Sequence, residues 1–133
     1  KPITINISSY GGSLHDYLVI QGLIETRKCK LITIALGKCM SAGAYLLILG
    51  DERYAYPNTR IMLHELSTCI HYDKLHEITT NTEELKKTQV ILNNIVAKHT
   101  KIKNIKNFLK DDRYMSPIEA IKLGVIDKVV GAK

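Results

Sequence analysis

The chain has 133 residues, of which 45% are hydrophobic and 24% are charged, and this is enough for one globular domain with its own core. Its formal net charge of +6 is scattered except in residues 98–110, where one aromatic side chain stands among the lysines, so the charge favours a solvated helix over a nucleic-acid-binding surface. No apolar run approaches the roughly 20 residues that span a bilayer, and the cysteines and histidines show no spacing typical of a metal site or a disulfide framework.

The first expected element is a strand, because apolar side chains alternate over residues 3–9. The turn sequence YGGS follows at 10–13, and Ser13 with Asp16 matches a capping box that begins a helix reaching about Arg27. A chain that opens directly on a strand favours a fragment, so we expect part of the domain to lie upstream.

The next two elements are expected to be buried. Residues 31–36 are apolar almost throughout, which is typical of a strand covered on both faces, and Gly37 is expected to end it. Residues 41–49 are nearly all apolar and are followed by Gly50, which predicts a short buried helix.

Strands and helices continue to alternate in the second half of the chain. Two short strands are expected within residues 53–65, a short helix near 102–110, a capped helix at 116–124 and a last strand within 125–130. This alternation predicts an α/β fold with a mainly parallel sheet and flanking helices.

Residues 73–98 are expected to form one long amphipathic helix, since neither glycine nor proline occurs between Glu65 and Ser116. Its apolar positions follow a 3–4 spacing, with Thr82 and Gln89 as polar interruptions. These apolar positions are Leu75, Ile78, Leu85, Leu92 and Val96. The seam they form is too long for one small domain to cover, which favours association with other chains.

Four positions are candidates for catalytic chemistry. Gly12 lies in a Gly-Gly turn, Ser41 begins the buried helix, His64 ends an apolar strand and Asp112 lies in a loop. Each has an ordinary structural explanation as well: a tight turn, a helix N-cap, a partly buried histidine and a solvated carboxylate. Together they supply an oxyanion site, a nucleophile, a base and an orienting carboxylate for acyl transfer, although spacing alone does not show that they meet.

Four runs of the sequence are similar to one known family and occur in that family's order. The chain thereby resembles the ClpP family, the proteolytic subunit of the ATP-dependent Clp protease, which has the ClpP/crotonase-like fold. The runs are INISSYGGS (5–13), IALGKCMSAGAYLLILG (34–50), YPNTRIMLH (56–64) and DRYMSPIEAIKLGVIDKV (112–129).

The resemblance implies a role for each candidate residue. Ser41 matches the family's nucleophile, His64 its general base and Asp112 the acidic member of its triad. Gly12 matches the first donor of the oxyanion hole, and Ala42, directly after the serine, matches the second.

The resemblance also implies partners. Residues 73–98 correspond to the family's handle helix, through which two heptameric rings meet to form a tetradecamer. The expected partners are an AAA+ Clp ATPase and unfolded polypeptide substrates, with no nucleic acid and no membrane. No cofactor is expected in this chain, since ATP is used by the partner unfoldase. We expect one ClpP-like domain over residues 1–133 that lacks the N-terminal part of the family domain, located in a plastid-type organelle such as the apicoplast, in the mitochondrial matrix or in the bacterial cytoplasm.

Three departures from the family pattern leave alternatives open. Tyr10 replaces the usual proline, Glu65-Leu66 replaces the usual Gln-Pro, and residues 67–77 contain none of the glycines expected in the strand that lines the substrate cleft. These changes favour, as an alternative, a non-catalytic ClpR-like structural subunit of a mixed barrel. A crotonase-type acyl-CoA enzyme is a third hypothesis, ranked last because its chemistry does not require this serine, histidine and aspartate.

Overall fold

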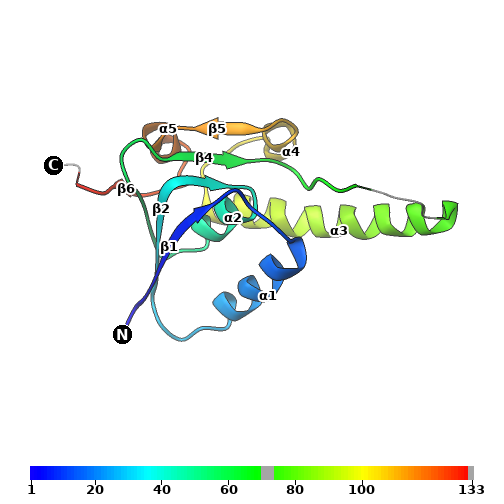
Figure 1. The fold of residues 1–133 in the computed structure, drawn as a ribbon, viewed down its shortest axis with the longest axis horizontal. Helices are drawn as coiled ribbons and strands as arrows, with labels where there is room; N and C mark the ends of the chain where they lie inside the picture. The colour runs from blue at the N-terminus through cyan, green and yellow to red at the C-terminus, as the bar shows by residue number, and fades with distance from the viewer. Residues whose placement is uncertain (70–73, 132–133) are drawn as a thin grey trace.

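A mainly parallel sheet forms the centre of the computed structural model, which describes residues 1–69 and 74–131 (Figure 1). The strand order within these residues is β5-β4-β2-β3-β6, and β1 also pairs with β2. The described pairings are parallel except that of β4 with β5. The strands are β1 (Ile3–Ser9), β2 (Leu31–Met40), β3 (Glu52–Ala55), β4 (Arg60–Leu63), β5 (Arg113–Met115) and β6 (Lys128–Val129).

Helices flank this sheet, so the predicted α/β class is confirmed. The helices are α1 (Leu14–Glu25), α2 (Ala42–Ile48), α3 (Leu75–His99), α4 (Ile105–Leu109) and α5 (Pro117–Lys122). The sequence pattern did not predict β5. Three residues are too few to show a strand period, and this element exists through its antiparallel pairing with β4, in which Leu63 lies opposite Arg113.

The prediction that Gly37 ends the second strand is wrong, because β2 continues to Met40. Gly37 has a φ of +57°, and the pairing of β1 with β2 shifts register beside it. Before this glycine, β2 pairs with β3, and after it residues Lys38–Met40 pair with β4. Gly37 therefore bends the strand from one neighbour to the other, a backbone conformation that favours glycine.

The buried helix α2 packs against the sheet as its composition predicts. Five of its seven residues are buried, and a Cβ on Gly43 would lie 3.2 Å from the Cβ of Ser9 on β1. The glycine thus permits close contact between helix and strand. Two further helices begin at the N-cap residues that the sequence predicts. Ser13 accepts the N–H of Asp16 at the start of α1, and Ser116 forms a capping box with Glu119 at the start of α5.

The 25-residue helix α3 is present and projects beyond the rest of the structure (Figure 1). It begins at Leu75 and ends at His99, whereas residue 73 of the predicted span lies outside the described residues. The exposed fraction of the seam side chains falls along the helix, from 82% at Leu75 to 1% at Leu92. Only the C-terminal part of α3 belongs to the core. No helix among the described residues has both the length and the apolar character to span a membrane.

Arg53 on β3 joins three separate parts of the chain. Its guanidinium pairs with the carboxylate of Asp127 at 2.7 Å and donates hydrogen bonds to the carbonyls of His99 and Gly124. Burial raises the pKa of Asp127, but the side-chain and backbone hydrogen bonds from Arg53 outweigh burial and hold that pKa below its ordinary value.

Asp127→Asn should lower the free energy of unfolding at neutral pH by about 1 kcal/mol, because the amide loses the charge-assisted pairing with Arg53. Because the pKa of Asp127 is lower in the folded than in the unfolded protein, its charged form stabilises the fold at a pH above the unfolded-state pKa of about 3.9. This stabilisation is lost as the pH falls through the folded-state pKa. The free energies of unfolding of the wild type and of Asp127→Asn, measured in urea, should therefore differ at pH 7. They should become equal as the pH falls toward the folded-state pKa of Asp127.

The control is Asp111→Asn, since Asp111 is largely exposed and lies 4.0 Å from Arg113. Its effect should stay below about 0.5 kcal/mol. A loss in Asp127→Asn that is the same at every pH would contradict the electrostatic explanation.

Candidate active site

Ser41 occupies a strained turn between β2 and α2. Its φ of 51° and ψ of −125° are uncommon for a residue with a side chain. The turn is held by its N–H, which donates to the carbonyl of Met62 at 2.9 Å, and by its own carbonyl, which accepts from Ala44 and Tyr45. Ser41 stands at the N-cap position of α2, but its hydroxyl does not cap the helix. Backbone strain of this kind costs about 1–3 kcal/mol and clusters at functional sites.

The Ser41 side chain instead contacts a histidine on the next strand. Nε2 of His64 lies 2.7 Å from Oγ of Ser41, and Nδ1 of His64 lies 3.5 Å from a carboxylate oxygen of Asp112. The first distance is that of a hydrogen bond, whereas the second is longer than one and is that of an ion pair. The three side chains expected to act together are therefore neighbours, with His64 between Ser41 and Asp112.

Strand register brings these three residues together. In the parallel pairing of β2 with β4, Met40 lies opposite Met62, so the residues that follow, Ser41 and then His64, emerge at the same edge of the sheet. In the antiparallel pairing of β4 with β5, Leu63 lies opposite Arg113, which places His64 beside Asp112. Residues 41, 64 and 112 are far apart in sequence, and only these two registers make them neighbours.

The carboxylate is much more exposed than the histidine. The side chain of His64 is 19% exposed and that of Asp112 is 61% exposed. The imidazole is therefore largely fixed by its surroundings, whereas Asp112 faces solvent, which weakens its electrostatic effect on the ring.

The Gly-Gly turn lies directly against Ser41. Gly11 has a φ of +109°, and a Cβ at this position would lie 2.6 Å from the Cβ of Ser41 and 3.1 Å from its Oγ. The N–H of Gly11 donates to Ser9 Oγ at 3.0 Å. The next N–H along the chain, that of Gly12, has no hydrogen-bond partner among the described residues. Gly11 is therefore the residue that allows the close approach, and Gly12 is the one that stays available.

Ala42 is the first residue of α2, whose leading N–H groups have no partner within the helix. Gly12 and Ala42 both line the cavity in front of Ser41. The two residues expected to donate to an oxyanion thus line the same cavity as the serine.

Tyr10, one of the three departures from the pattern of the family that the sequence resembles, contacts β2. Lys38 donates to its hydroxyl at 2.8 Å and lies 4.6 Å from the centre of its ring. This contact anchors the Gly-Gly turn from outside the cavity.

A cavity of about 440 Å³ opens in front of Ser41 and His64. Leucines and two tyrosines supply its apolar surface, and short polar side chains stand around them. Besides Gly12, Ser41, Ala42 and His64, its lining consists of Ser13, Leu14, His15, Tyr17, Tyr45, Glu65, Leu66, Ser67, Thr68, Leu85 and Leu92. The cavity therefore places Ser41 beside a partly apolar surface that could hold part of a ligand.

The sequence analysis missed one residue that supports His64. The hydroxyl of Tyr45 donates to the backbone carbonyl of His64 at 2.9 Å. Burial raises the pKa of Tyr45, so its hydroxyl stays protonated as a donor. The available signal was a single tyrosine in an otherwise aliphatic buried helix, because a buried hydroxyl requires a partner.

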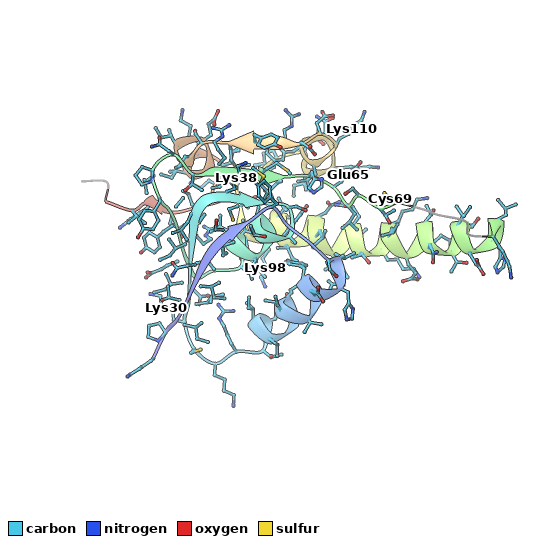
Figure 2. The ribbon with its side chains drawn as sticks, viewed as in Figure 1. Lys30, Lys38, Glu65, Cys69, Lys98 and Lys110 are labelled. Carbon is cyan, nitrogen blue, oxygen red and sulfur yellow. The ribbon has the colours of Figure 1, made fainter. Side chains whose placement is uncertain are left out.

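Glu65 follows His64 and was one of the departures from the family pattern. Figure 2 shows it beyond the end of β4, on the side of α4, and its N–H donates to the carbonyl of Leu109 at 2.7 Å. Within residues 1–69 and 74–131, the ion pair of His64 is with Asp112 and not with Glu65. The segment 67–69 forms no strand, and residues 70–73 of the region without glycine lie outside the described residues.

No group of three or more His, Cys, Asp or Glu side chains in the described part of the chain is arranged to bind a metal ion. The reactive groups present are a serine, a histidine and a carboxylate in line, which is the arrangement that serine hydrolases use for acyl transfer. The family model described as Clp protease matches residues 1–133, so the chain belongs to the Clp protease family. Membership in this family supports a peptidase function.

Gly11→Ala should lower the free energy of unfolding by about 2 kcal/mol or more, because alanine is strained at this φ and its Cβ collides with Ser41. Gly12→Ala is the matched control, since a Cβ there has no atom within 4 Å, and should cost less than about 1 kcal/mol. Urea unfolding measures both, and equal losses would show that Gly11 is not in close contact with Ser41.

Proposed function

We propose that this chain is a serine endopeptidase subunit of an ATP-dependent Clp protease barrel that degrades unfolded proteins. The observation that supports this most directly is the 2.7 Å contact between Ser41 Oγ and His64 Nε2 at a strained strand–helix turn. A serine hydroxyl is a weak nucleophile unless a neighbouring base accepts its proton, and this contact supplies the base.

In the proposed reaction, Oγ of Ser41 attacks the carbonyl carbon of a peptide bond while its proton passes to Nε2 of His64. The carbonyl oxygen becomes an oxyanion, for which the backbone N–H groups of Gly12 and Ala42 are the proposed donors. Collapse of this intermediate breaks the C–N bond, and His64 returns the proton to the leaving amine. Water then attacks the acyl-enzyme through the same base and releases the new carboxylic acid and Ser41.

Asp112 is proposed to orient His64. A carboxylate beside Nδ1 favours the tautomer that carries its proton on that nitrogen, which leaves Nε2 free to accept the serine proton. The 3.5 Å separation and the exposure of Asp112 support an orienting role that is weaker than that of a buried carboxylate.

The proposed assembly is a heptameric ring, two of which form a tetradecamer, with an AAA+ Clp ATPase as the partner that uses ATP. Its support in this chain is the long helix α3, which projects from the domain and exposes Leu75 to 82% and, nearer its buried end, Val90 and Ile91 to 56% and 43%. Apolar side chains on a projecting helix are typical of a surface that another chain covers. The compartment, an organelle interior or the bacterial cytoplasm, stays a prediction.

Ser41→Ala in the full-length protein should lower peptide hydrolysis by about a factor of 10³ or more and abolish labelling by a fluorophosphonate, because both require the serine oxygen. Ser8→Ala is the matched control, since Ser8 is exposed on β1 away from the cavity, and should keep the wild-type rate. Hydrolysis that persists in Ser41→Ala would contradict the proposal. A wild-type protein that never reacts with the probe, yet joins a ring with an active relative, would favour the ClpR-like alternative.

The full-length protein should sediment as a ring of seven subunits or as a pair of rings. Val90→Glu with Ile91→Glu should shift it toward smaller species, because two charges then replace two exposed apolar side chains of α3. Lys87→Glu, at an exposed position of the same helix that is already charged, is the control. Wild-type protein that sediments only as a monomer at micromolar concentration would contradict the proposed assembly.

A further inference from the structure

The polar interruption of the α3 seam at Gln89 has a specific contact. Oε1 of Gln89 accepts the backbone N–H of Leu66 at 2.7 Å, and its Nε2 donates to Oδ1 of Asn93 at 2.8 Å. Gln89 and Asn93 are half-buried. Since both ends of the Gln89 amide are engaged, the side chain is held in one orientation.

Leu66 belongs to the short segment of residues 64–66, which directly follows β4 and includes His64. Two other backbone groups of the segment form hydrogen bonds in the described part of the chain: the Tyr45 hydroxyl donates to the carbonyl of His64, and the N–H of Glu65 donates to the carbonyl of Leu109. Three helices thus each hold one backbone group of three consecutive residues. On the C-terminal side of His64, Gln89 is the side chain that fixes this segment.

This segment forms part of the cavity. Leu66 lines it together with Ser41 and His64, and the segment 67–69 that follows has no strand pairing to hold it. If the Leu66 N–H lost its acceptor, the backbone after His64 would be held only by the contacts at residues 64 and 65. A displacement of about 1 Å in a catalytic group is enough to cost roughly 10²-fold in rate.

We propose that Gln89 is a positioning residue for the reaction, which acts through the Leu66 N–H to hold the imidazole of His64 against Ser41. This inference rests on the proposed function. It assigns to α3 a role in the peptidase site in addition to the exposed seam that the same helix presents.

The surroundings of Gln89 make a conservative variant possible. A second cavity of about 380 Å³, which Ser41 does not line, is lined by Gln89, Lys86, Lys106 and Glu65, among others. A carboxylate at position 89 would keep an acceptor for Leu66 and would have two lysines near it to offset Glu65. The amide of Asn93 would turn to donate to it.

The test compares Gln89→Leu, which removes the acceptor, with Gln89→Glu, which keeps it, in the full-length protein. Gln89→Leu should lower kcat and the rate of fluorophosphonate labelling at Ser41 by about tenfold or more, with a smaller change in KM. Gln89→Glu should stay within about threefold of the wild type, since the hydrogen bond to Leu66 remains. Thr88→Val is the control, because within residues 1–69 and 74–131 the Thr88 hydroxyl donates to the carbonyl of Glu84 in its own helix and not to the segment after His64.

Hydrogen exchange at the Leu66 amide gives a measurement that does not depend on activity. Exchange should be faster in Gln89→Leu and unchanged in Gln89→Glu and Thr88→Val. Urea unfolding and sedimentation should be unchanged in all three, and if Gln89→Leu fails these checks, Gln89→Ala replaces it.

An active wild type whose Gln89→Leu and Gln89→Ala variants keep full kcat and labelling rate would overturn the positioning role alone. A wild type that neither hydrolyses peptides nor reacts with the probe would overturn the proposed function, whatever the exchange at Leu66 shows. Loss of activity in Gln89→Glu equal to that in Gln89→Leu would also overturn the inference, because the acceptor would then not be what matters.

Discussion

The bend of β2 at Gly37 is the constraint on which the rest of the site depends. One strand pairs with β3 before the glycine and with β4 after it, so the end of β2 is delivered to the end of β4. Ser41 follows directly and turns into α2 with its N–H on the carbonyl of Met62. Without that change of neighbour, His64 would not be next to the serine. A residue with a side chain would resist the φ of +57° that the bend requires.

The parts of the site differ in how firmly the fold holds them. Ser41 lies between two regular elements and accepts backbone strain, and His64 is mostly buried and has its carbonyl held by Tyr45. Asp112 lies in an exposed loop before a three-residue strand. The serine and the histidine are therefore positioned by the core, whereas the carboxylate depends on a short strand pairing, and solvent screens its effect on the imidazole.

Helix α3 combines two environments in one element. Its C-terminal part is buried with Leu92, Ile95 and Val96, and its N-terminal part projects from the domain. Gln89 lies at the boundary between them and reaches the segment after His64. A movement of the projecting part would therefore displace Gln89 before it displaced the buried turns, because packing holds those turns in place.

The sequence alone determined the elements whose signals are local. Alternating apolar residues marked β1, uniform apolarity marked α2, and the Ser-Pro-x-Glu pattern marked the start of α5, because periodicity and capping depend on residues close together in the chain. The same local signals identified Ser41, His64, Asp112 and Gly12 as candidates, each with an ordinary alternative explanation, and resemblance to a family connected them and added Ala42. Only the tertiary structure decided that Gly37 bends β2 rather than ending it, that β5 exists, that Ser41 does not cap its helix, and that Tyr45 and Gln89 hold the segment around His64. These features depend on strand register and on contacts between residues 19 or more positions apart, and no local pattern in the sequence encodes them.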